Sequence, residues 1–197
     1  RWLVNTLSVV CTLGLICVLA VTTSFSAYYH SAMESDMRYR AKTTTDFFAE
    51  YINQSYNEYY QSCINYANSF EERNTIELQF INASGHLVVS SYGNWAGLSP
   101  VTQDVSDALN NRIISSFTGT DPHTGERIVA VSSPMIYSSG EVIGVLRYVT
   151  STRILDFQIL KIFLFSLVIL AIAMLVVIFS SSYYIRSILI PVNEITE

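Results

Sequence analysis

The side chains of this sequence that could do chemistry are few and scattered. His30, His86 and His123 lie far apart, and the last two fall in predicted turns. Because histidine titrates near neutral pH, such a side chain can sense protons, but a histidine in a turn is usually just exposed to solvent. Asp121, His123 and Glu126 share one loop and could bind a cation, although a polar surface loop accounts for them as well. These patterns predict no catalytic residues, no metal site and no cofactor.

Arg147 is the residue whose surroundings most suggest a ligand. Strand alternation places it on a face shared with apolar residues, and a guanidinium on such a face needs a partner. The partner is an internal carboxylate or an anionic group of a ligand, unless the side chain reaches solvent at the end of the strand. Arg127 begins the neighbouring strand and could join Arg147. Tyr137 and Tyr148 could line the same pocket, although both also suit the core, and the predicted ligand-binding group therefore comprises these four residues.

Charge and cysteine content narrow the class of protein. The 197-residue chain has 16 acidic and 11 basic residues, for a formal net charge of −5 at pH 7. This balance argues against nucleic acid as a partner, because phosphates require a basic surface. Three cysteines give no disulfide framework. Cys63 is the only cysteine of the polar middle part, and its place on an apolar helical stripe predicts a buried thiol.

Two long segments without charged residues flank a polar middle part. Residues 2–29 and 162–185 contain no Asp, Glu, Lys or Arg, and a helix needs roughly 20 apolar residues to cross the bilayer core. The first segment is too long for the apolar part of a signal peptide, so we expect an anchor that is not cleaved. The predicted organisation is a transmembrane helix over 1–29, a polar domain over 30–160, a second transmembrane helix over 161–185 and a further segment that begins over 186–197.

Hydrophobic periodicity changes within the polar part from helical to strand-like. Residues 31–73 contain no Pro or Gly and place apolar residues three and four apart, which predicts one long helix. The remaining pattern predicts strands 75–81 and 87–91, helix 101–111, and strands 112–117, 127–137 and 142–150. The last strand is apolar on both sides, which indicates a sheet covered by helix on one face and by loops on the other. The fold class is therefore an α+β membrane protein, in which two transmembrane helices flank a long N-terminal helix and an antiparallel sheet of about five strands.

The polar part continues directly into the second apolar segment. Residues 153–161 have a helical pattern without a flexible linker, so a displacement of the last strand would reach the membrane helix. Farther on, Pro191 suits the first turn of a new helix, with Val192 and Ile195 on its apolar side. One such helix cannot bury its own apolar stripe, so a homodimer is expected. A chain that stops on this opening turn is expected to be the input half of a longer receptor.

Three segments of the polar part resemble a known family of sensor domains. They are residues 80–91 (FINASGHLVVSS), 124–135 (TGERIVAVSSPM) and 140–150 (GEVIGVLRYVT), between two membrane anchors. In this order they resemble the extracytoplasmic PAS-like (Cache-type) sensor region of bacterial transmembrane histidine kinases, including the envelope- and phosphate-responsive kinases of Gram-positive bacteria. Residues 186–197, with Pro191 followed by apolar positions, resemble the start of a HAMP linker.

The resemblance implies a function and a location. The chain would be the input part of a two-component sensor histidine kinase that relays a signal across the bacterial plasma membrane. Its partners would be a second copy of itself, the lipid bilayer, an extracytoplasmic ligand or protein, and a response regulator reached through a cytoplasmic part. Two other functions stay open: the sensor half of a chemoreceptor or cyclic-dinucleotide enzyme, and a two-span envelope protein whose outer domain binds a protein. The fragment contains no kinase motif, so kinase identity rests on the resemblance alone.

Cysteine labelling tests this topology. Ser84→Cys, in a predicted hairpin turn, should react with a membrane-impermeant thiol reagent applied outside the cell. Asn193→Cys should react only from the cytoplasmic side, because the second apolar segment lies between the two positions. A parent chain whose native cysteines are replaced by serine is the control. Labelling of both positions from the same side would exclude this topology.

Overall fold

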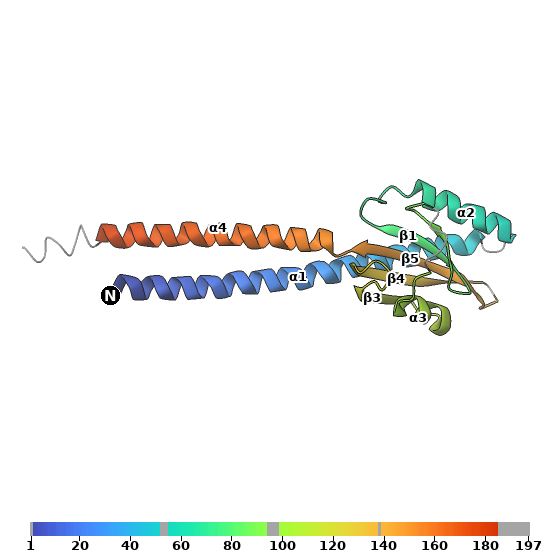
Figure 1. Ribbon diagram of the computed structural model, residues 1–197, viewed down its shortest axis with the longest axis horizontal. Coiled ribbons are helices and arrows are strands. Elements are labelled where there is room, and N and C mark those ends of the chain that lie inside the picture. Colours follow the sequence, from blue (N-terminus) through green and yellow to red (C-terminus); the bar gives the residue numbers. More distant parts are fainter. Residues whose placement is uncertain (1, 52–54, 94–98, 138, 185–197) are drawn as a thin grey trace, which may run out of the picture. The chain divides into compact units, whose positions relative to one another are not determined.

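The structure is a computed structural model that describes residues 2–51, 55–93, 99–137 and 139–184. The chain forms two compact units. Residues before Tyr29 and after Leu155 belong to the first unit, and Tyr29–Leu155 form the second. Helices α1 (Trp2–Tyr51) and α4 (Arg153–Tyr184) each contribute residues to both units (Figure 1).

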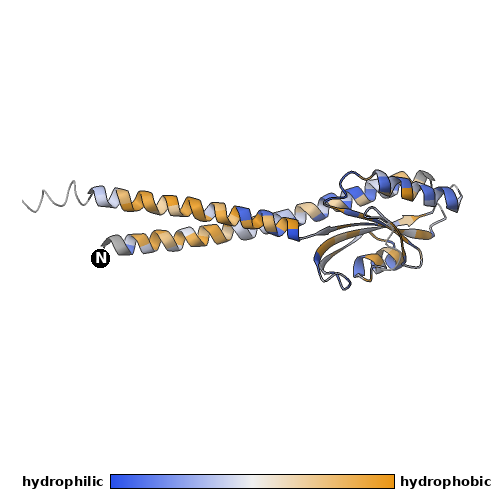
Figure 2. Ribbon diagram, turned by 45° about the horizontal axis from the view of Figure 1, so that its top comes forward, coloured by the Kyte–Doolittle hydropathy of each residue, from blue (hydrophilic) through white to orange (hydrophobic). Residues whose placement is uncertain are grey.

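The first unit is formed by the apolar parts of α1 and α4. Both helices are long and apolar enough to cross a membrane, and Figure 2 shows hydrophobic residues along these parts. Gly14 of α1 lies so close to Leu170 of α4 that a Cβ atom at position 14 would collide with the leucine side chain. A small residue at such a contact allows two helices to approach closely. Two candidate membrane helices therefore flank the second unit in the sequence, as predicted.

The second unit is built on an antiparallel sheet. In the part of the chain that the structure describes, five strands follow the order β2-β1-β5-β4-β3, and every neighbouring pair is antiparallel. The strands are β1 (Glu77–Asn82), β2 (Leu87–Ser90), β3 (Ser115–Thr120), β4 (Arg127–Ile136) and β5 (Val142–Ser151). The last strand of the sequence, β5, is thus the central strand of the sheet. The predicted α+β fold, with a long helix and a five-stranded antiparallel sheet, is confirmed.

The β1–β2 hairpin shows how local chemistry shapes the sheet. Asn82 ends β1, and its Oδ1 atom accepts hydrogen bonds from the N–H groups of Ser84 (3.0 Å) and His86 (2.9 Å). Gly85 adopts a φ of 81°, a conformation that glycine reaches without steric cost. The loop therefore returns the chain antiparallel to β1, as its turn residues predicted.

Two helices cover one face of the sheet. Helix α2 (Tyr56–Ser69) and the part of α1 in this unit share a core with β1, β4 and β5. Phe48 of α1 is fully buried, and its ring centroid lies 5.3 Å from that of Phe80 in β1. Full burial of such a side chain contributes about 1.5–3 kcal/mol. Cys63 of α2 is buried in the same core, as predicted, and burial raises the pKa of its thiol to about 12.

The single helix predicted over 31–73 is wrong. Helix α1 ends at Tyr51, and α2 begins at Tyr56. Ser55 caps α2: its side chain accepts a hydrogen bond from the N–H of Glu58, and the Glu58 carboxylate accepts one from the N–H of Ser55 (3.0 Å). This reciprocal pair is a capping box, which satisfies backbone donors at a new helix start. The apolar stripe continues on both sides of the break, so periodicity alone did not reveal it.

The third strand begins later than predicted. We expected residues 112–117, but β3 is Ser115–Thr120. Helix α3 (Gln103–Asn111) is followed by its C-cap residue, Arg112, which adopts a left-handed conformation with a φ of 58°. The chain needs the residues after this cap to turn away from the helix, so pairing with β4 starts only at Ser115.

Helix α3 packs on the face of the sheet opposite α1 and α2. Val105 and Ala108 of α3 are buried against Ile81 of β1 and Val145 of β5. The central strand is therefore buried on both sides, which its apolar pattern predicted. A short helix, and not loops alone, provides part of the second cover.

Candidate ligand-binding site

A buried ion pair joins α3 to the centre of the sheet. The side chains of Arg147 in β5 and Asp104 in α3 are 1% and 0% exposed, and Arg147 Nε lies 2.8 Å from Asp104 Oδ2. Taking two charges out of water costs several kcal/mol per ion unless they are tightly paired and hydrogen-bonded. The pair therefore requires further polar partners.

Three neutral side chains provide those partners. Arg147 donates from Nη1 to Gln79 Oε1 (3.0 Å) and from Nη2 to Thr102 Oγ1 (2.8 Å). Ser132 donates from Oγ to Asp104 Oδ2 (2.7 Å), the oxygen that also accepts from Arg147. The other carboxylate oxygen of Asp104 is buried without a hydrogen-bond partner among the described residues. Strands β1, β4 and β5 and the start of α3 thus meet around one guanidinium.

The sequence left two kinds of partner open for Arg147, and the structure shows an internal carboxylate. Asp104 precedes Arg147 by 43 residues, so only the folded sheet brings the two together. In the sequence, Asp104 stands out only as an acidic residue in the first turn of a helix. Negative charge is favoured at that position in any helix, so the signal did not identify the pairing.

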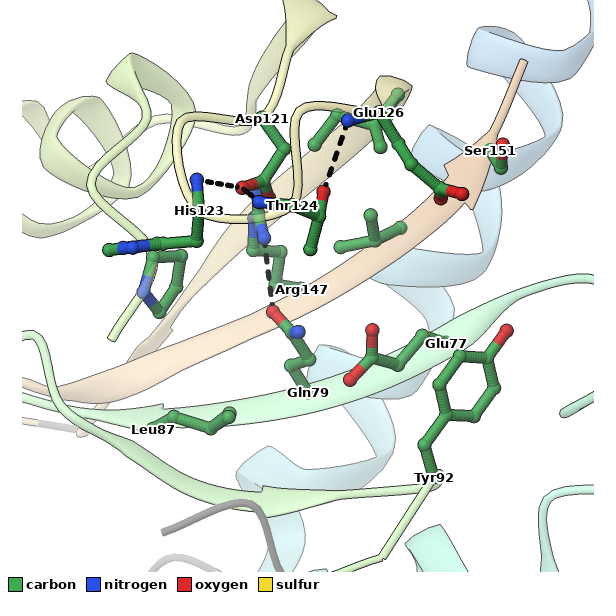
Figure 3. A pocket seen from close by; sticks show the side chains of 13 residues that line it. Glu77, Gln79, Leu87, Tyr92, Asp121, His123, Thr124, Glu126, Arg147 and Ser151 are labelled. Carbon is green, nitrogen blue, oxygen red and sulfur yellow. Dashed lines mark hydrogen bonds between the residues drawn. The ribbon is translucent and has the colours of Figure 1, made fainter. Parts of the chain in front are cut away.

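A pocket of about 290 Å³ opens on the same face of the sheet as the ion pair (Figure 3). Gln79 of β1 and Arg147 and Val149 of β5 form its floor. The other described lining residues come from β1, β2, β4, the end of β5 and three loop segments: Glu77, Leu87, Tyr92, Pro100, Asp121, His123, Thr124, Glu126, Ile128 and Ser151. This volume lies near the lower end of those typical of small-molecule sites.

The loop between β3 and β4 forms one wall and is held by its own hydrogen bonds. Asp121 Oδ1 accepts from the N–H groups of His123 (2.7 Å) and Thr124 (3.1 Å). His123 Nε2 lies 3.1 Å from the carbonyl oxygen of Ser99, which ties the loop to the segment before α3. Within the described ranges, no three His, Cys, Asp or Glu side chains converge closely enough to hold a metal ion.

One end of the pocket has two carboxylates near an aromatic ring. Glu77 Oε1 accepts a hydrogen bond from Ser90 Oγ (2.6 Å), which fixes this side chain on the surface of β1. Figure 3 shows the Tyr92 ring beside Glu77. The pKa of Tyr92 is raised, first by partial burial and then by the negative charges of Glu77 and Glu126. This end of the pocket therefore has a negative potential.

The structure brings one of the four predicted ligand residues to this pocket. Arg147 lines it, whereas Tyr148 points to the opposite face, where its hydroxyl lies 3.0 Å from Thr44 Oγ1. Burial in that core raises the pKa of Tyr148. Tyr137 packs against the same core, and Arg127, exposed at the start of β4, is not among the residues that line the pocket. The predicted group is thus divided between the two sides of the sheet.

Several pocket residues were not singled out in the sequence. Glu77 and Gln79 alternate with the buried Leu78 and Phe80 along β1, so a polar face of this strand was a readable signal. Tyr92 follows β2 and had no such signal. The sequence did group Asp121, His123 and Glu126 in one loop, but nothing in it placed that loop over β5. The predicted relay residues lie outside the described residues: Pro191, Val192 and Ile195.

Solved structures of bacterial sensor domains share this fold. One is the ligand-binding domain of the Pseudomonas aeruginosa PAO1 amino acid chemoreceptor PctC, in complex with GABA. Its alignment covers 69% of this chain and 60% of the PctC chain, at 17% identity and a TM-score of 0.50. The alignment with the ligand-binding domain of the Campylobacter jejuni chemoreceptor Tlp3, with L-valine, covers 79% of this chain and 65% of Tlp3, at 16% identity and a TM-score of 0.51. The alignment with the ligand-binding domain of Mlp24, with asparagine, covers 74% of this chain and 60% of Mlp24, at 14% identity and a TM-score of 0.51.

These similarities establish the fold and leave the function to be argued from the site. The chain spans 60–65% of the length of these three structures. No family model and no curated protein matches the sequence. The second unit therefore has the fold of these ligand-binding domains, and this coarser part of the predicted resemblance is confirmed.

Loss of the ion pair should destabilise the second unit strongly. Arg147→Ala should lower the free energy of unfolding by about 3–5 kcal/mol, because it leaves the Asp104 charge buried without its partner. Chemical denaturation of the 197-residue chain in detergent, followed by intrinsic fluorescence, measures the change. Arg127→Ala removes an exposed arginine from the neighbouring strand and should change stability by less than about 0.5 kcal/mol.

A double variant separates charge from packing in this experiment. Arg147→Met with Asp104→Leu should regain most of the lost stability, because no charge is then left buried. An Arg147→Ala variant as stable as the Arg127→Ala control would contradict a stabilising role for the pair.

Proposed function

We propose that this chain is the sensing and membrane-spanning part of a bacterial receptor, and that the pocket binds its small-molecule signal. The position of the pocket on β5 carries the proposal. Arg147, Val149 and Ser151 of this strand line the pocket, and α4 begins at Arg153, directly after the strand. A ligand that shifts these residues would act on the strand that continues into an apolar helix.

Two further observations support a small-molecule ligand. The pocket volume of about 290 Å³ suits a molecule with a few carbon atoms. The sensor domains with the same fold are described with GABA, L-valine and asparagine. We infer a ligand of similar size for this chain, without inferring the same chemistry.

The proposed location is the bacterial plasma membrane. Residues 1–29 and 161–185 would cross the bilayer, and residues 30–160 would lie outside the cytoplasm. The two long apolar helices support this arrangement, as does the likeness of the sheet domain to extracellular sensor domains. The lipid bilayer is then one partner of the chain, and a second copy of the chain is the other partner that we propose.

The proposed output is that of a sensor histidine kinase. Residues 186–197 would begin a HAMP linker in which Pro191 starts a helix, and Val192 and Ile195 would face the core of a dimeric bundle. A response regulator would then receive the signal. A chemoreceptor output is the second candidate, because PctC and Tlp3, which have this sensor fold, are chemoreceptors.

Blocking the pocket should abolish the response of the full-length receptor. Thr124→Trp places a large ring on an exposed lining position and should exclude the ligand without disturbing the core. Thr118→Trp, at an exposed position of β3 outside the pocket lining, is the matched control. A reporter of receptor output measures the response, with protein levels checked by immunoblot. A normal response from the blocked variant would show that the signal enters elsewhere.

Uncoupling β5 from α4 tests the relay. Three glycines inserted between Thr152 and Arg153 should leave expression and dimerisation intact but remove the response, because a flexible segment does not transmit a small displacement. The same insertion between Ser84 and Gly85, in the β1–β2 turn, should be tolerated. Wild-type signalling with the first insertion would instead favour sensing through α1 or the membrane.

A further inference from the structure

The charges around the pocket restrict the class of ligand. The described part of its lining has three carboxylates, those of Glu77, Asp121 and Glu126, and one arginine. That arginine, Arg147, is already neutralised by Asp104 at 2.8 Å. An anionic ligand would therefore meet three negative charges and no unpaired arginine or lysine among the described lining residues.

The floor of the pocket is fixed in this arrangement. Arg147 is 1% exposed and Gln79 is 9% exposed, and a 3.0 Å hydrogen bond joins them. The three nitrogen atoms of the guanidinium are directed to Asp104, Gln79 and Thr102. Turning Arg147 toward a ligand carboxylate would break the buried pair, whose loss costs more than one new contact returns.

The other end of the pocket has the groups that bind ammonium ions. Glu77, Glu126 and Tyr92 line the same cavity, and Figure 3 shows Glu77 beside the Tyr92 ring. After partial burial, the negative charges of the two glutamates contribute to the raised pKa of Tyr92. An aromatic face attracts a cation through its quadrupole, and a carboxylate accepts charge-assisted hydrogen bonds from N–H donors. A cavity lined by an aromatic ring, an adjacent carboxylate and a second carboxylate is therefore complementary to an amine.

We propose that the pocket binds an organic ammonium ion without a carboxylate, such as a small aliphatic mono- or diamine, with its charged end between Glu77, Glu126 and Tyr92. This inference rests on the proposed function and adds the class of ligand. A second amino group of a diamine would extend toward Asp121 in the β3–β4 loop.

The arrangement of the ligating side chains favours an organic cation over a metal ion. A metal requires several ligands at about 2–2.6 Å from one point, and no such group of three side chains occurs in the described part of the chain. The carboxylates come from β1 and from the two ends of the β3–β4 loop, where the N–H of Asp121 donates a hydrogen bond to the carbonyl oxygen of Glu126 (2.8 Å). Each carboxylate can accept charge-assisted hydrogen bonds from the N–H groups of an organic cation.

Four probes of equal length and different charge test the proposal. The purified 197-residue chain, in nanodiscs of phosphatidylcholine, is titrated calorimetrically with 1,4-diaminobutane, 4-aminobutanoate, butanedioate and 1,4-butanediol. We expect saturable binding of the diamine, binding at least about tenfold weaker for 4-aminobutanoate, and none for butanedioate. Calcium chloride is the fifth titrant and should not compete with the diamine.

Three single variants locate the binding. Glu126→Gln and Glu77→Gln should each weaken diamine binding about tenfold. The glutamine at position 77 can still accept the hydrogen bond from Ser90, so the strand surface is retained. Glu141→Gln removes the same charge from an exposed turn outside the pocket and should leave the affinity unchanged.

Several outcomes would overturn the inference. Tighter binding of 4-aminobutanoate or butanedioate than of the diamine would show that the ligand class is wrong, while the proposed sensing role would stand. Competition by calcium would assign the carboxylates to a metal. If Glu141→Gln weakened diamine binding as much as the two pocket variants, the binding would reflect general attraction of a cation to an acidic protein and not a site in the pocket. Absence of saturable diamine binding would also reject the proposed ligand class. The proposed function is tested separately, and it fails if the Thr124→Trp receptor still responds.

Discussion

The buried charge of Arg147 is the constraint on which the second unit depends. A guanidinium that is 1% exposed in the middle of a sheet must be neutralised and hydrogen-bonded throughout. Asp104 and Thr102 must therefore stay at the start of α3. Gln79 of β1 must stay within reach of Arg147, and Ser132 of β4 within reach of Asp104. The same requirement holds α3 over one face of the sheet. It also leaves the pocket with a polar floor of no net charge, so that selection by charge falls to the walls.

The central strand connects this floor to both helices that lead to the apolar unit. One face of β5 lines the pocket, and the other presents Tyr148, whose hydroxyl lies 3.0 Å from Thr44 Oγ1 of α1. In the neighbouring strand, Ser133 Oγ lies 2.8 Å from Thr45 Oγ1 of the same helix. The end of β5 runs into α4. A displacement of β5 would therefore act on α1 through buried hydrogen bonds and on α4 through the chain itself.

Local patterns predicted the sheet well and the helices less well. Strands β2 and β4 begin where expected, because Gly-containing turns and alternation mark their ends. The new helix start at Ser55 was missed because the apolar stripe continues on both sides of it, while the capping box that marks it involves only two side chains. At the site, the apolar face of its strand predicted that Arg147 needs a partner. Which residue that partner is, 43 positions away, depends on the complete fold. Alternation alone already separates Arg147 from Tyr148, since neighbouring residues of a strand face opposite sides.

The floor and the walls of the pocket differ in how freely their residues can be substituted. This difference explains why the fold does not identify the ligand. Replacing Arg147 or Asp104 alone would leave the other charge buried without a partner, so single substitutions in the floor cost stability. Tyr92, Thr124 and Glu126 are exposed and lie outside the core, so their side chains can change at little cost in stability. A shared sheet at 14–17% identity is thus compatible with a different ligand in each protein. The charge of the walls, which here is negative around an aromatic ring, is the feature from which the ligand of this chain can be inferred.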